Sequence, residues 1–145
     1  MDIFANPDLL AVRQLLSESS LPISDISARH LQHFFGCGSG PGLEGVIGLE
    51  LFDEVALLRS LAVVSSCRNA GLGSGLVAHA ERHARAQGIR NIYLLTTTAE
   101  DFFLRRGYAR LEKAQAPTAI KSTKEFSGIC PVSSAFMVKH LEFIS

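Results

Sequence analysis

The spacing of hydrophobic residues predicts helices and strands that follow one another along the whole chain. Apolar side chains recur at helical spacing over residues 9–16, and Asn6 and Pro7 are suited to be the cap and the first helical residue. A shorter helical stretch is predicted around residues 24–31. The remaining helices are predicted over residues 73–87, over residues 99–106 with Thr98 as the cap, and over residues 117–126.

Segments rich in β-branched and aromatic residues predict the strands. Residues 46–52 and 55–64 form a predicted hairpin, and residues 34–39 are predicted as an edge strand. The other strands are predicted over residues 89–96, 108–112 and 134–141. Strands that first pair as hairpins and then alternate with helices indicate one mixed sheet with helices packed on it. No repeat or linker divides the chain, so we expect a single domain over residues 1–145.

The composition argues against several classes of protein. Fourteen basic and fourteen acidic side chains cancel, whereas a dedicated nucleic-acid binder carries a basic excess. The apolar runs end well before the ~20 residues of a membrane-spanning helix, and the N-terminus lacks the pattern of a signal peptide. The three cysteines have unrelated spacings, so we expect no disulfide framework and a cytoplasmic location.

Charge is divided unevenly between the two halves of the chain. Residues 1–60 carry three arginines and eight acids, a net charge of −5, and residues 61–145 carry eleven bases and six acids, a net charge of +5. This division fits either an ordinary dipolar surface or a second half that receives an anion.

A glycine-rich loop is the most informative chemical feature. Arg68, Gly71, Gly73 and Gly75 stand between a buried strand and an amphipathic helix. Glycines let backbone N–H groups curl round an anion, and the helix N-terminus and Arg68 add positive potential. The loop predicts a cradle for a diphosphate, with a plain strand-to-helix turn as the alternative. The chain lacks the Gly-Lys pair of a P-loop, and the third glycine of a dinucleotide fingerprint falls one position early.

Two motifs follow one another along the chain: Arg68-x-x-Gly71-x-Gly73 after Leu61-Ala62-Val63, and Ala99-x-x-Phe102-Phe103-x-x-x-Gly107-Tyr108. Their order and separation resemble those of the GNAT superfamily of acetyl-CoA-dependent N-acetyltransferases. The resemblance implies an α/β (α+β) fold with a mixed, mostly antiparallel twisted sheet of about six to seven strands, flanked by about four to five helices.

Further segments are similar to a small GNAT subgroup that is encoded beside bacterial arsenic-resistance genes. These segments are residues 57–63, residues 94–99 and the tail that carries Pro117, Ile120, Thr123, Glu125, Phe126, Cys130, Pro131 and residues 133–135. This similarity implies a genetic association with arsenic resistance and does not define the reaction that is catalysed.

The resemblance also implies how the cofactor binds and reacts. Acetyl-CoA is a co-substrate, and a deprotonated primary amine attacks its thioester directly in a ternary complex. The backbone N–H of Ala62 or Val63 serves as the oxyanion donor. The residues implied in cofactor binding are Leu61, Ala62, Val63, Arg68, Asn69, Gly71, Leu72, Gly73, Ser74, Gly75, Thr96, Ala99, Phe102 and Phe103.

The chain departs from the family at the positions that usually transfer protons. Leu57 and Arg59 stand where many members carry a Glu or His base, and Phe103 stands where a Tyr acid is frequent. None of these three side chains exchanges a proton near neutral pH. The amine therefore enters already neutral, or another group carries its proton. The candidates left open are Glu50 and Glu54, each acting through water, Tyr93 and Tyr108.

Arg59 decides which acceptor the sequence favours. Period-two alternation places Arg59 on the strand face of Leu57, Leu61 and Val63, with Ser60 facing the other way. A buried arginine needs an anionic partner. The partner is either a neighbouring acid, Asp53 or Glu54, or an anionic group of the acceptor.

With Arg59 and Thr97 as its contacts, the expected acceptor is a small, anionic, amino-acid-like amine. Two alternatives remain: a non-catalytic acyl-CoA-binding sensor, and an acetyltransferase for a protein lysine or a polyamine. No nucleic acid or membrane is expected as a partner. Members of the superfamily often dimerise, so the resemblance implies a homodimer.

The histidines and cysteines give weaker signals. His79 and His83 are four residues apart, but the sequence between them is not that of an H-E-x-x-H site, so we expect a packed or solvated pair and no metal. Cys67, beside the glycine loop, is open as a nucleophile in an electropositive setting.

Overall fold

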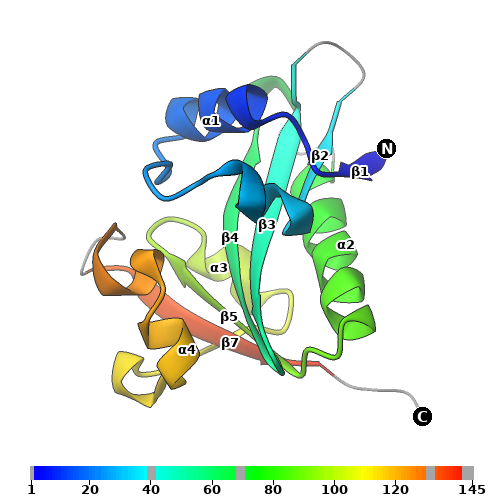
Figure 1. Ribbon diagram of the computed structural model, residues 1–145. Coiled ribbons are helices and arrows are strands. Elements are labelled where there is room, and N and C mark those ends of the chain that lie inside the picture. The colour runs from blue at the N-terminus through cyan, green and yellow to red at the C-terminus, as the bar shows by residue number, and fades with distance from the viewer. Residues whose placement is uncertain (1, 39–41, 68–70, 130–132, 142–145) are drawn as a thin grey trace.

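The computed structural model describes residues 2–38, 42–67, 71–129 and 133–141, and within these ranges seven strands form one sheet (Figure 1). The strands are β1 (Ile3–Ala5), β2 (Phe34–Cys37), β3 (Gly45–Phe52), β4 (Val55–Val63), β5 (Asn91–Thr96), β6 (Ala109–Arg110) and β7 (Ala135–His140). Their order in the sheet is β1-β2-β3-β4-β5-β7-β6. β4 and β5 are parallel, and every other neighbouring pair is antiparallel. The mixed, mostly antiparallel sheet expected from the sequence is thereby confirmed.

Helices cover both faces of this sheet. The α-helices in the described ranges are α1 (Leu9–Glu18), α2 (Leu72–Ala86), α3 (Glu100–Leu104) and α4 (Thr118–Lys121). Shorter turns are the 3-10 helices η1 (Ala28–His33), η2 (Ser65–Cys67) and η3 (Lys113–Gln115), and the π-helix η4 (Glu125–Ile129). α2 and α3 pack on one face through residues such as Leu76 and Phe103. α1 and α4 pack on the other face, through residues such as Leu16 and Ile120.

The first helix begins two residues later than predicted. Asp8 caps α1 in place of Asn6, because its carboxylate accepts a hydrogen bond from the backbone N–H of Ala11 at 3.0 Å. Asn6 has a φ of 56° and donates its own backbone N–H to the carbonyl of Phe34. It therefore belongs to the connection from β1 rather than to the helix.

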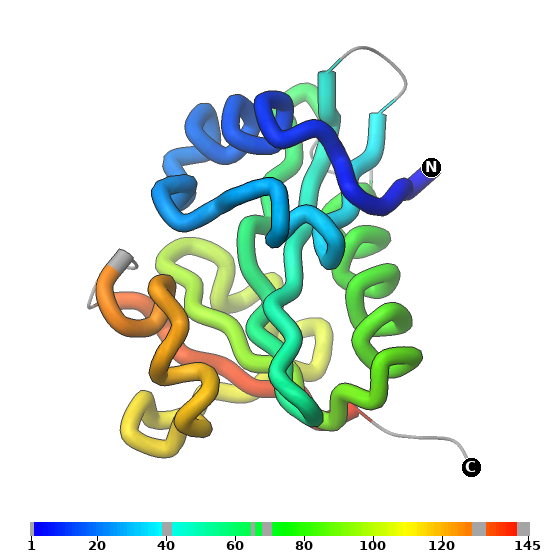
Figure 2. Tube along the Cα trace, viewed as in Figure 1, coloured from blue at the N-terminus to red at the C-terminus, as the bar shows by residue number. Residues whose placement is uncertain are grey.

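Other boundaries also differ from the predictions. Only the end of residues 24–31 is helical, as the start of η1. Residues 34–37 form an inner strand, because β1 pairs with the outer side of β2. The strand predicted over residues 108–112 is reduced to β6, and the helix predicted over residues 117–126 is replaced by α4 and η4. Figure 2 shows the chain between α1 and η1 and the chain around η4 on the same side of the sheet.

β4 and β5 pair over three residues and then diverge. Residues 55–57 of β4 lie opposite residues 91–93 of β5, and the register goes no further. In Figure 1 the two strands lie together at the lower end and separate upwards. Beyond the paired residues, their facing edges carry backbone N–H and C=O groups that have no neighbouring strand on that side. The sheet therefore opens next to the loop that connects β4 to α2.

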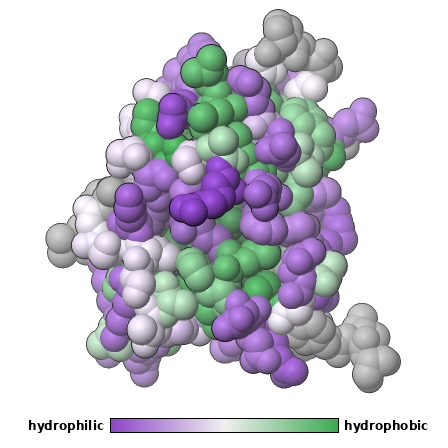
Figure 3. All heavy atoms as spheres, in the orientation of Figure 1, coloured by the Kyte–Doolittle hydropathy of each residue, from purple (hydrophilic) through white to green (hydrophobic). Residues whose placement is uncertain are grey.

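The surface seen in Figure 3 carries hydrophilic side chains over much of its area, with smaller hydrophobic patches between them. No helix within the described ranges is long and apolar enough to cross a membrane.

Gly48 of β3 leaves room for the ring of Phe34. A Cβ at this position would lie 2.4 Å from two ring atoms of Phe34, whose side chain is fully buried. We expect Gly48→Ala to lower the free energy of unfolding by about 1–3 kcal/mol, the usual cost of overpacking, as measured by urea denaturation. Gly42→Ala is the matched control, because an added Cβ there meets nothing within 4 Å. Equal effects of the two variants would contradict this account of the core.

Candidate functional site

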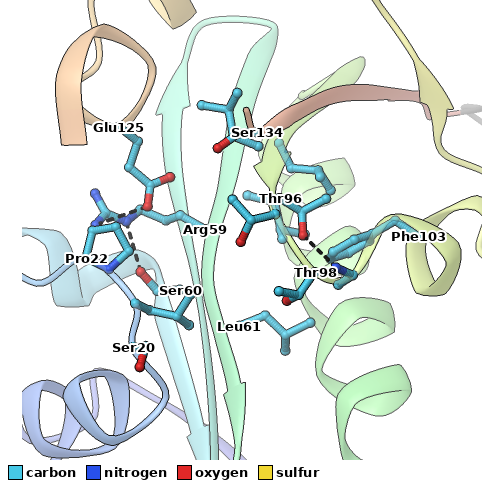
Figure 4. A pocket seen from close by; sticks show the side chains of 16 residues that line it. Ser20, Pro22, Arg59, Ser60, Leu61, Thr96, Thr98, Phe103, Glu125 and Ser134 are labelled. Atoms are coloured by element: carbon cyan, nitrogen blue, oxygen red, sulfur yellow. Dashed lines mark hydrogen bonds and ion pairs between the residues drawn. The ribbon is translucent and has the colours of Figure 1, made fainter. Parts of the chain in front are cut away.

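Two adjoining cavities lie where the sheet opens. The larger, of about 760 Å³, is called the loop cavity, and the smaller, of about 410 Å³, is called the strand cavity. Both are lined by Leu21, Leu61, Thr98 and Ala99, so they meet at these residues. The loop cavity is also lined by Ser19, Ala62, Val63, Cys67, Gly71, Leu72, Gly73, Ser74, Asp101, Phe102, Arg105 and Arg106. The strand cavity (Figure 4) is also lined by Ser20, Pro22, Leu58, Arg59, Ser60, Leu94, Leu95, Thr96, Thr97, Phe103, Glu125 and Ser134.

The structure brings together most of the residues predicted for cofactor binding. Those around the loop cavity are Leu61, Ala62, Val63, Gly71, Leu72, Gly73, Ser74, Ala99 and Phe102. Thr96 and Phe103 lie around the strand cavity instead, together with Thr97, which the sequence predicted as a contact of the acceptor. Gly75 lies further along α2 and lines neither cavity. Arg68 and Asn69 lie outside the described residues.

The N-terminus of α2 forms one wall of the loop cavity. Gly71 caps the helix in the left-handed conformation, with a φ of 79°, and provides no side-chain cap for the first turn. The backbone N–H groups of Leu72, Gly73 and Ser74 have no partner within the helix. Helix N-termini of this kind attract anions.

Arg105 and Arg106 add positive charge to the opposite wall, which the sequence reasoning did not anticipate. The guanidinium of Arg106 lies 3.6 Å from the centre of the Phe102 ring, and its Nη1 donates to the carbonyl of Phe102 at 2.8 Å. Its Nε is buried and has no hydrogen-bond partner in the described part of the chain. Burial, and then the neighbouring Arg105, lower the pKa of Arg106. This wall thus carries two cationic side chains beside the acid Asp101, and an anion could satisfy the unbonded Nε of Arg106.

Beside the strand cavity, the hydroxyl of Thr96 caps the turn that leads from β5 into α3. Its Oγ1 accepts a hydrogen bond from the backbone N–H of Ala99 at 3.0 Å. The sequence assigned this role to Thr98, whose side chain is instead exposed at the junction of the two cavities.

An extra residue in β4 reverses the alternation of side chains beyond Arg59. The register of the β3–β4 pair shifts by one residue here, and Ser60 has a φ of 61°. Leu61 and Val63 consequently pack against the α2 side of the sheet, whereas Leu57 packs on the α4 side. The predicted common face of Arg59 with Leu61 and Val63 is therefore wrong, and Ser60 lines the same cavity as Arg59.

Arg59 binds three carboxylates from separate parts of the chain. Its Nη2 donates to Oδ1 of Asp25 at 2.7 Å, and its Nη1 donates to Oδ2 of the same group. Nη1 also donates to Oε2 of Glu50 at 2.9 Å, and Nη2 lies 3.5 Å from Oε1 of Glu125. Nε donates to the hydroxyl of Ser60 at 3.0 Å. We call Asp25, Glu50, Arg59 and Glu125 the ion cluster.

The ion cluster corrects the expectation for Arg59. Its partners are not Asp53 or Glu54: Glu54 lies at the surface, where its Oε1 is 3.6 Å from Nε of Arg90. Four of the five N–H groups of the Arg59 guanidinium donate hydrogen bonds to Ser60, Asp25 and Glu50, and its Nη2 also lies 3.5 Å from Glu125. Because the protein's own carboxylates already surround the buried guanidinium, Arg59 is a poor site for an anionic group of a ligand. Burial opposes its charge, but Asp25 and Glu125 raise the pKa of Arg59 above its ordinary value.

Glu125 is the residue of the cavity that the sequence reasoning missed as a functional group. Its side chain is 5% exposed and, in Figure 4, points to the guanidinium of Arg59 at the edge of the cavity. Burial, which the attraction of Arg59 offsets only in part, raises the pKa of Glu125 to about 7, and the carboxylates of Asp25 and Glu50 contribute. The sequence showed Glu125 only as an acid near the end of the helix predicted over residues 117–126, and this pattern gave no reason to expect its burial.

The proton carriers proposed from the sequence lie elsewhere. Glu50, with Asp25, lines a third cavity of about 380 Å³ on the other side of the ion cluster. The Tyr108 hydroxyl is buried and donates to Glu81 at 2.9 Å, and burial together with Glu81 raises its pKa. Tyr93 stacks on Phe136, and burial raises its pKa also. Neither tyrosine lines the strand cavity.

Cys67 has an acidic neighbour rather than the electropositive setting expected. Its Sγ donates to Oε2 of Glu44 at 2.9 Å, and this hydrogen bond raises the pKa of the thiol, which disfavours the nucleophilic thiolate. His83 lies 3.2 Å from His33, ring nitrogen to ring nitrogen, and packs on Phe35. Among the described residues, no group of three or more His, Cys, Asp and Glu side chains is placed to hold a metal. Cys130 lies outside these residues.

The sequences of known proteins identify relatives of this chain. The model of the acetyltransferase (GNAT) family matches residues 10–111. An uncharacterized N-acetyltransferase of Chlorobaculum tepidum is 33% identical over 92 residues, which is 63% of this chain and 59% of that protein. An amino-acid acetyltransferase of Ralstonia nicotianae is 37% identical over 56 residues, which is 39% of this chain and 12% of that protein. The chain thus spans less than two thirds of the length of either relative.

Solved structures share the fold over nearly the whole chain. The N-acetylglutamate synthase of Neisseria gonorrhoeae, complexed with coenzyme A and L-arginine, has a TM-score of 0.82 at 22% identity, over 98% of this chain and 33% of that chain. Rv2747 of Mycobacterium tuberculosis, in complex with coenzyme A and NLQ, has a TM-score of 0.81 at 17% identity, over 98% of this chain and 100% of that chain. These identities show a common fold alone. Because the family model spans more than half of the sequence, the chain belongs to the GNAT family of acetyltransferases.

Proposed function

We propose that this chain transfers acetyl from acetyl-CoA to the amine of a small, amino-acid-like acceptor by direct attack in a ternary complex. The coenzyme occupies the loop cavity and the acceptor occupies the strand cavity. The observation that carries the proposal is the junction of the two cavities at Leu61, Thr98 and Ala99. Direct transfer requires that the amine and the thioester meet, and adjoining cavities allow this contact.

The walls of the loop cavity suit coenzyme A. The first turn of α2 and the cations of Arg105 and Arg106 would face its phosphates. The open edge of β4 would pair with the extended pantetheine arm, as an added strand does. The backbone N–H of Ala62 or Val63 stays the proposed oxyanion donor.

The walls of the strand cavity suit a zwitterion. Its polar side chains include the hydroxyls of Ser60, Thr97 and Ser134 and the carboxyl of Glu125. Ser134 is 6% exposed, and its Oγ has no hydrogen-bond partner in the described part of the chain, so a polar ligand atom would satisfy it. The similarity to an amino-acid acetyltransferase and to an N-acetylglutamate synthase supports an amino acid as the acceptor. Since three carboxyl groups of the protein already surround Arg59, the ammonium group rather than an anionic group would face the ion cluster.

A polyamine or a protein lysine is the second candidate acceptor. With one guanidinium and three carboxyl groups, the ion cluster has an excess of acidic groups, which favours a cationic ligand. Membership of the arsenic-resistance-associated subgroup, a homodimer and a cytoplasmic location stay proposals that rest on the sequence.

The test combines titration calorimetry with a free-thiol release assay. We expect wild-type protein to bind acetyl-CoA and to release thiol with at least one of the twenty L-amino acids. Spermidine and Nα-acetyl-lysine amide, included as acceptors, identify the second candidate if they react faster. The absence of acetyl-CoA binding would refute the proposal for both acceptor classes. Binding without thiol release from any acceptor would favour the non-catalytic sensor.

A further inference from the structure

The charges around Arg59 are not equivalent with respect to the two cavities that flank them. Asp25 and Glu50 line the third cavity and Glu125 lines the strand cavity. Asp25 and Glu50 each accept a hydrogen bond from Arg59 of 2.9 Å or less, whereas Glu125 lies 3.5 Å from its Nη2. Glu125 is therefore the most loosely held of the three carboxylates. It is also the one that faces the proposed acceptor.

The position of Glu125 relative to the junction is suited to proton transfer. In Figure 4, Glu125 and Arg59 lie on one side of the strand cavity and Thr98 on the other, with Ser60 and Leu61 of the β4 bulge between them. An amine bound in this cavity would lie between the carboxyl group of Glu125 and the junction with the loop cavity, where the thioester is proposed. General bases act when they lie within hydrogen-bond reach of the proton that they remove.

The surroundings of Glu125 also set its proton affinity. The charged groups that face it are Arg59 of β4, Glu50 of β3 and Asp25 of the α1–η1 connection, and Lys124 precedes it in its own segment. Burial and the two carboxylates outweigh Arg59 and raise the pKa of Glu125 to about 7. The α-ammonium group of a free amino acid has a higher pKa than the roughly 8 of a peptide N-terminus, because its own carboxylate stabilises the positive charge. It therefore needs a base to lose its proton near neutral pH, and a base whose pKa lies near the working pH can take up that proton and release it again.

We propose that Glu125 is the general base of the acetyl transfer and removes one proton from the ammonium group of the acceptor. The assignment rests on the proposed function. The neutral nitrogen then forms the new C–N bond with the thioester carbonyl carbon, and the C–S bond breaks with its electron pair on sulfur. The second proton of the nitrogen goes to this thiolate to give free coenzyme A. Glu125 returns its proton to solvent.

Asp25, Glu50 and Arg59 are positioning residues in this scheme. Arg59 orients the carboxyl group of Glu125, and Asp25 and Glu50 compensate most of the charge of Arg59. Without these two acids, the guanidinium would hold Glu125 in its ionised form and weaken it as a base.

The test is the pH profile of Glu125→Gln, an amide of nearly the same size. Thiol release is measured between pH 5.5 and 9.5 with acetyl-CoA and the amine acceptor that reacts fastest with wild-type protein. We expect wild-type kcat/KM to rise as the pH increases through about 7, because Glu125 loses its own proton there. In Glu125→Gln this inflection should disappear, and kcat at pH 7.5 should fall about 10²–10⁴-fold. Glu125→Asp should keep the inflection at a reduced rate.

Two controls separate a failure of this assignment from a failure of the proposed function. Acetyl-CoA affinity, measured by calorimetry, should be the same in Glu125→Gln and wild type, and Glu112→Gln, at an exposed position, should leave the profile unchanged. If Glu125→Gln keeps the inflection and loses only a uniform fraction of its rate, Glu125 is structural and the assignment is overturned. If wild-type protein transfers acetyl to no acceptor, the proposed function is overturned, and the assignment with it.

Discussion

Replacement of Arg59 by methionine is expected to lower the free energy of unfolding by about 3–5 kcal/mol, as is usual when one partner of a buried ion pair is removed. Asp25 and Glu125 are buried almost completely, with 3% and 5% of their side chains exposed, and Glu50 is 16% exposed. Without the guanidinium, three carboxylates of like charge would face one another in a medium of low polarity. Urea denaturation at pH 7.5 measures the loss.

The free energy of unfolding of Arg59→Met should depend on pH in the opposite sense to that of a protein stabilised by ionised acids, which loses stability as the pH falls. The unpaired carboxylates of Arg59→Met take up protons more readily than those of the unfolded chain, so their pKa values rise on folding. The destabilisation should therefore shrink as the pH falls from 8 to about 5. Arg90→Met is the matched control, because its ion pair with Glu54 is exposed and worth less than about 1 kcal/mol. A loss no larger than that of the control would show that the ion cluster does not depend on Arg59.

Replacement of Gly73 by leucine is expected to weaken acetyl-CoA binding strongly without destabilising the protein. A Cβ at Gly73 would lie 3.5 Å from the ring of Phe102 and 3.9 Å from a methyl group of Val63, both of which line the loop cavity. A leucine side chain would extend beyond this point into the space proposed for the coenzyme. We expect the affinity to fall about 100-fold or more, the upper end of the cost of overpacking.

The stability of Gly73→Leu should be unchanged or slightly increased, because leucine is a better helix former than glycine by up to about 1 kcal/mol. Gly73→Ala is the control, since a Cβ fits at ordinary contact distance, and it should bind acetyl-CoA with nearly wild-type affinity. Calorimetry measures the affinities and thermal unfolding the stabilities. Wild-type affinity in Gly73→Leu would show that the loop cavity is not the coenzyme site.

Local sequence patterns predicted the core of the sheet well. The hairpin of β3 and β4 and the long helix α2 were predicted within one or two residues, because their apolar residues repeat with a clear period over eight or more positions. The shorter elements near the strand cavity were predicted poorly. Within residues 24–31 and 117–126, the predicted regular helices do not form at Asp25 and Glu125, the two residues that contact Arg59. Such contacts join residues 34 and 66 positions away from Arg59, which no local pattern encodes.

The sequence by itself determined the family, the mixed sheet and the glycine loop before α2, because these depend on short motifs and on periodic burial. Only the tertiary structure decided which ionisable side chains lie together beside that loop. The bulge at Ser60 reverses which side chains of β4 share a face. The ion cluster surrounds Arg59 with three carboxyl groups and leaves Glu125 facing the strand cavity. The physical reason is that the charge of a buried group depends on the other charges around it, and folding brings those together from distant parts of the chain.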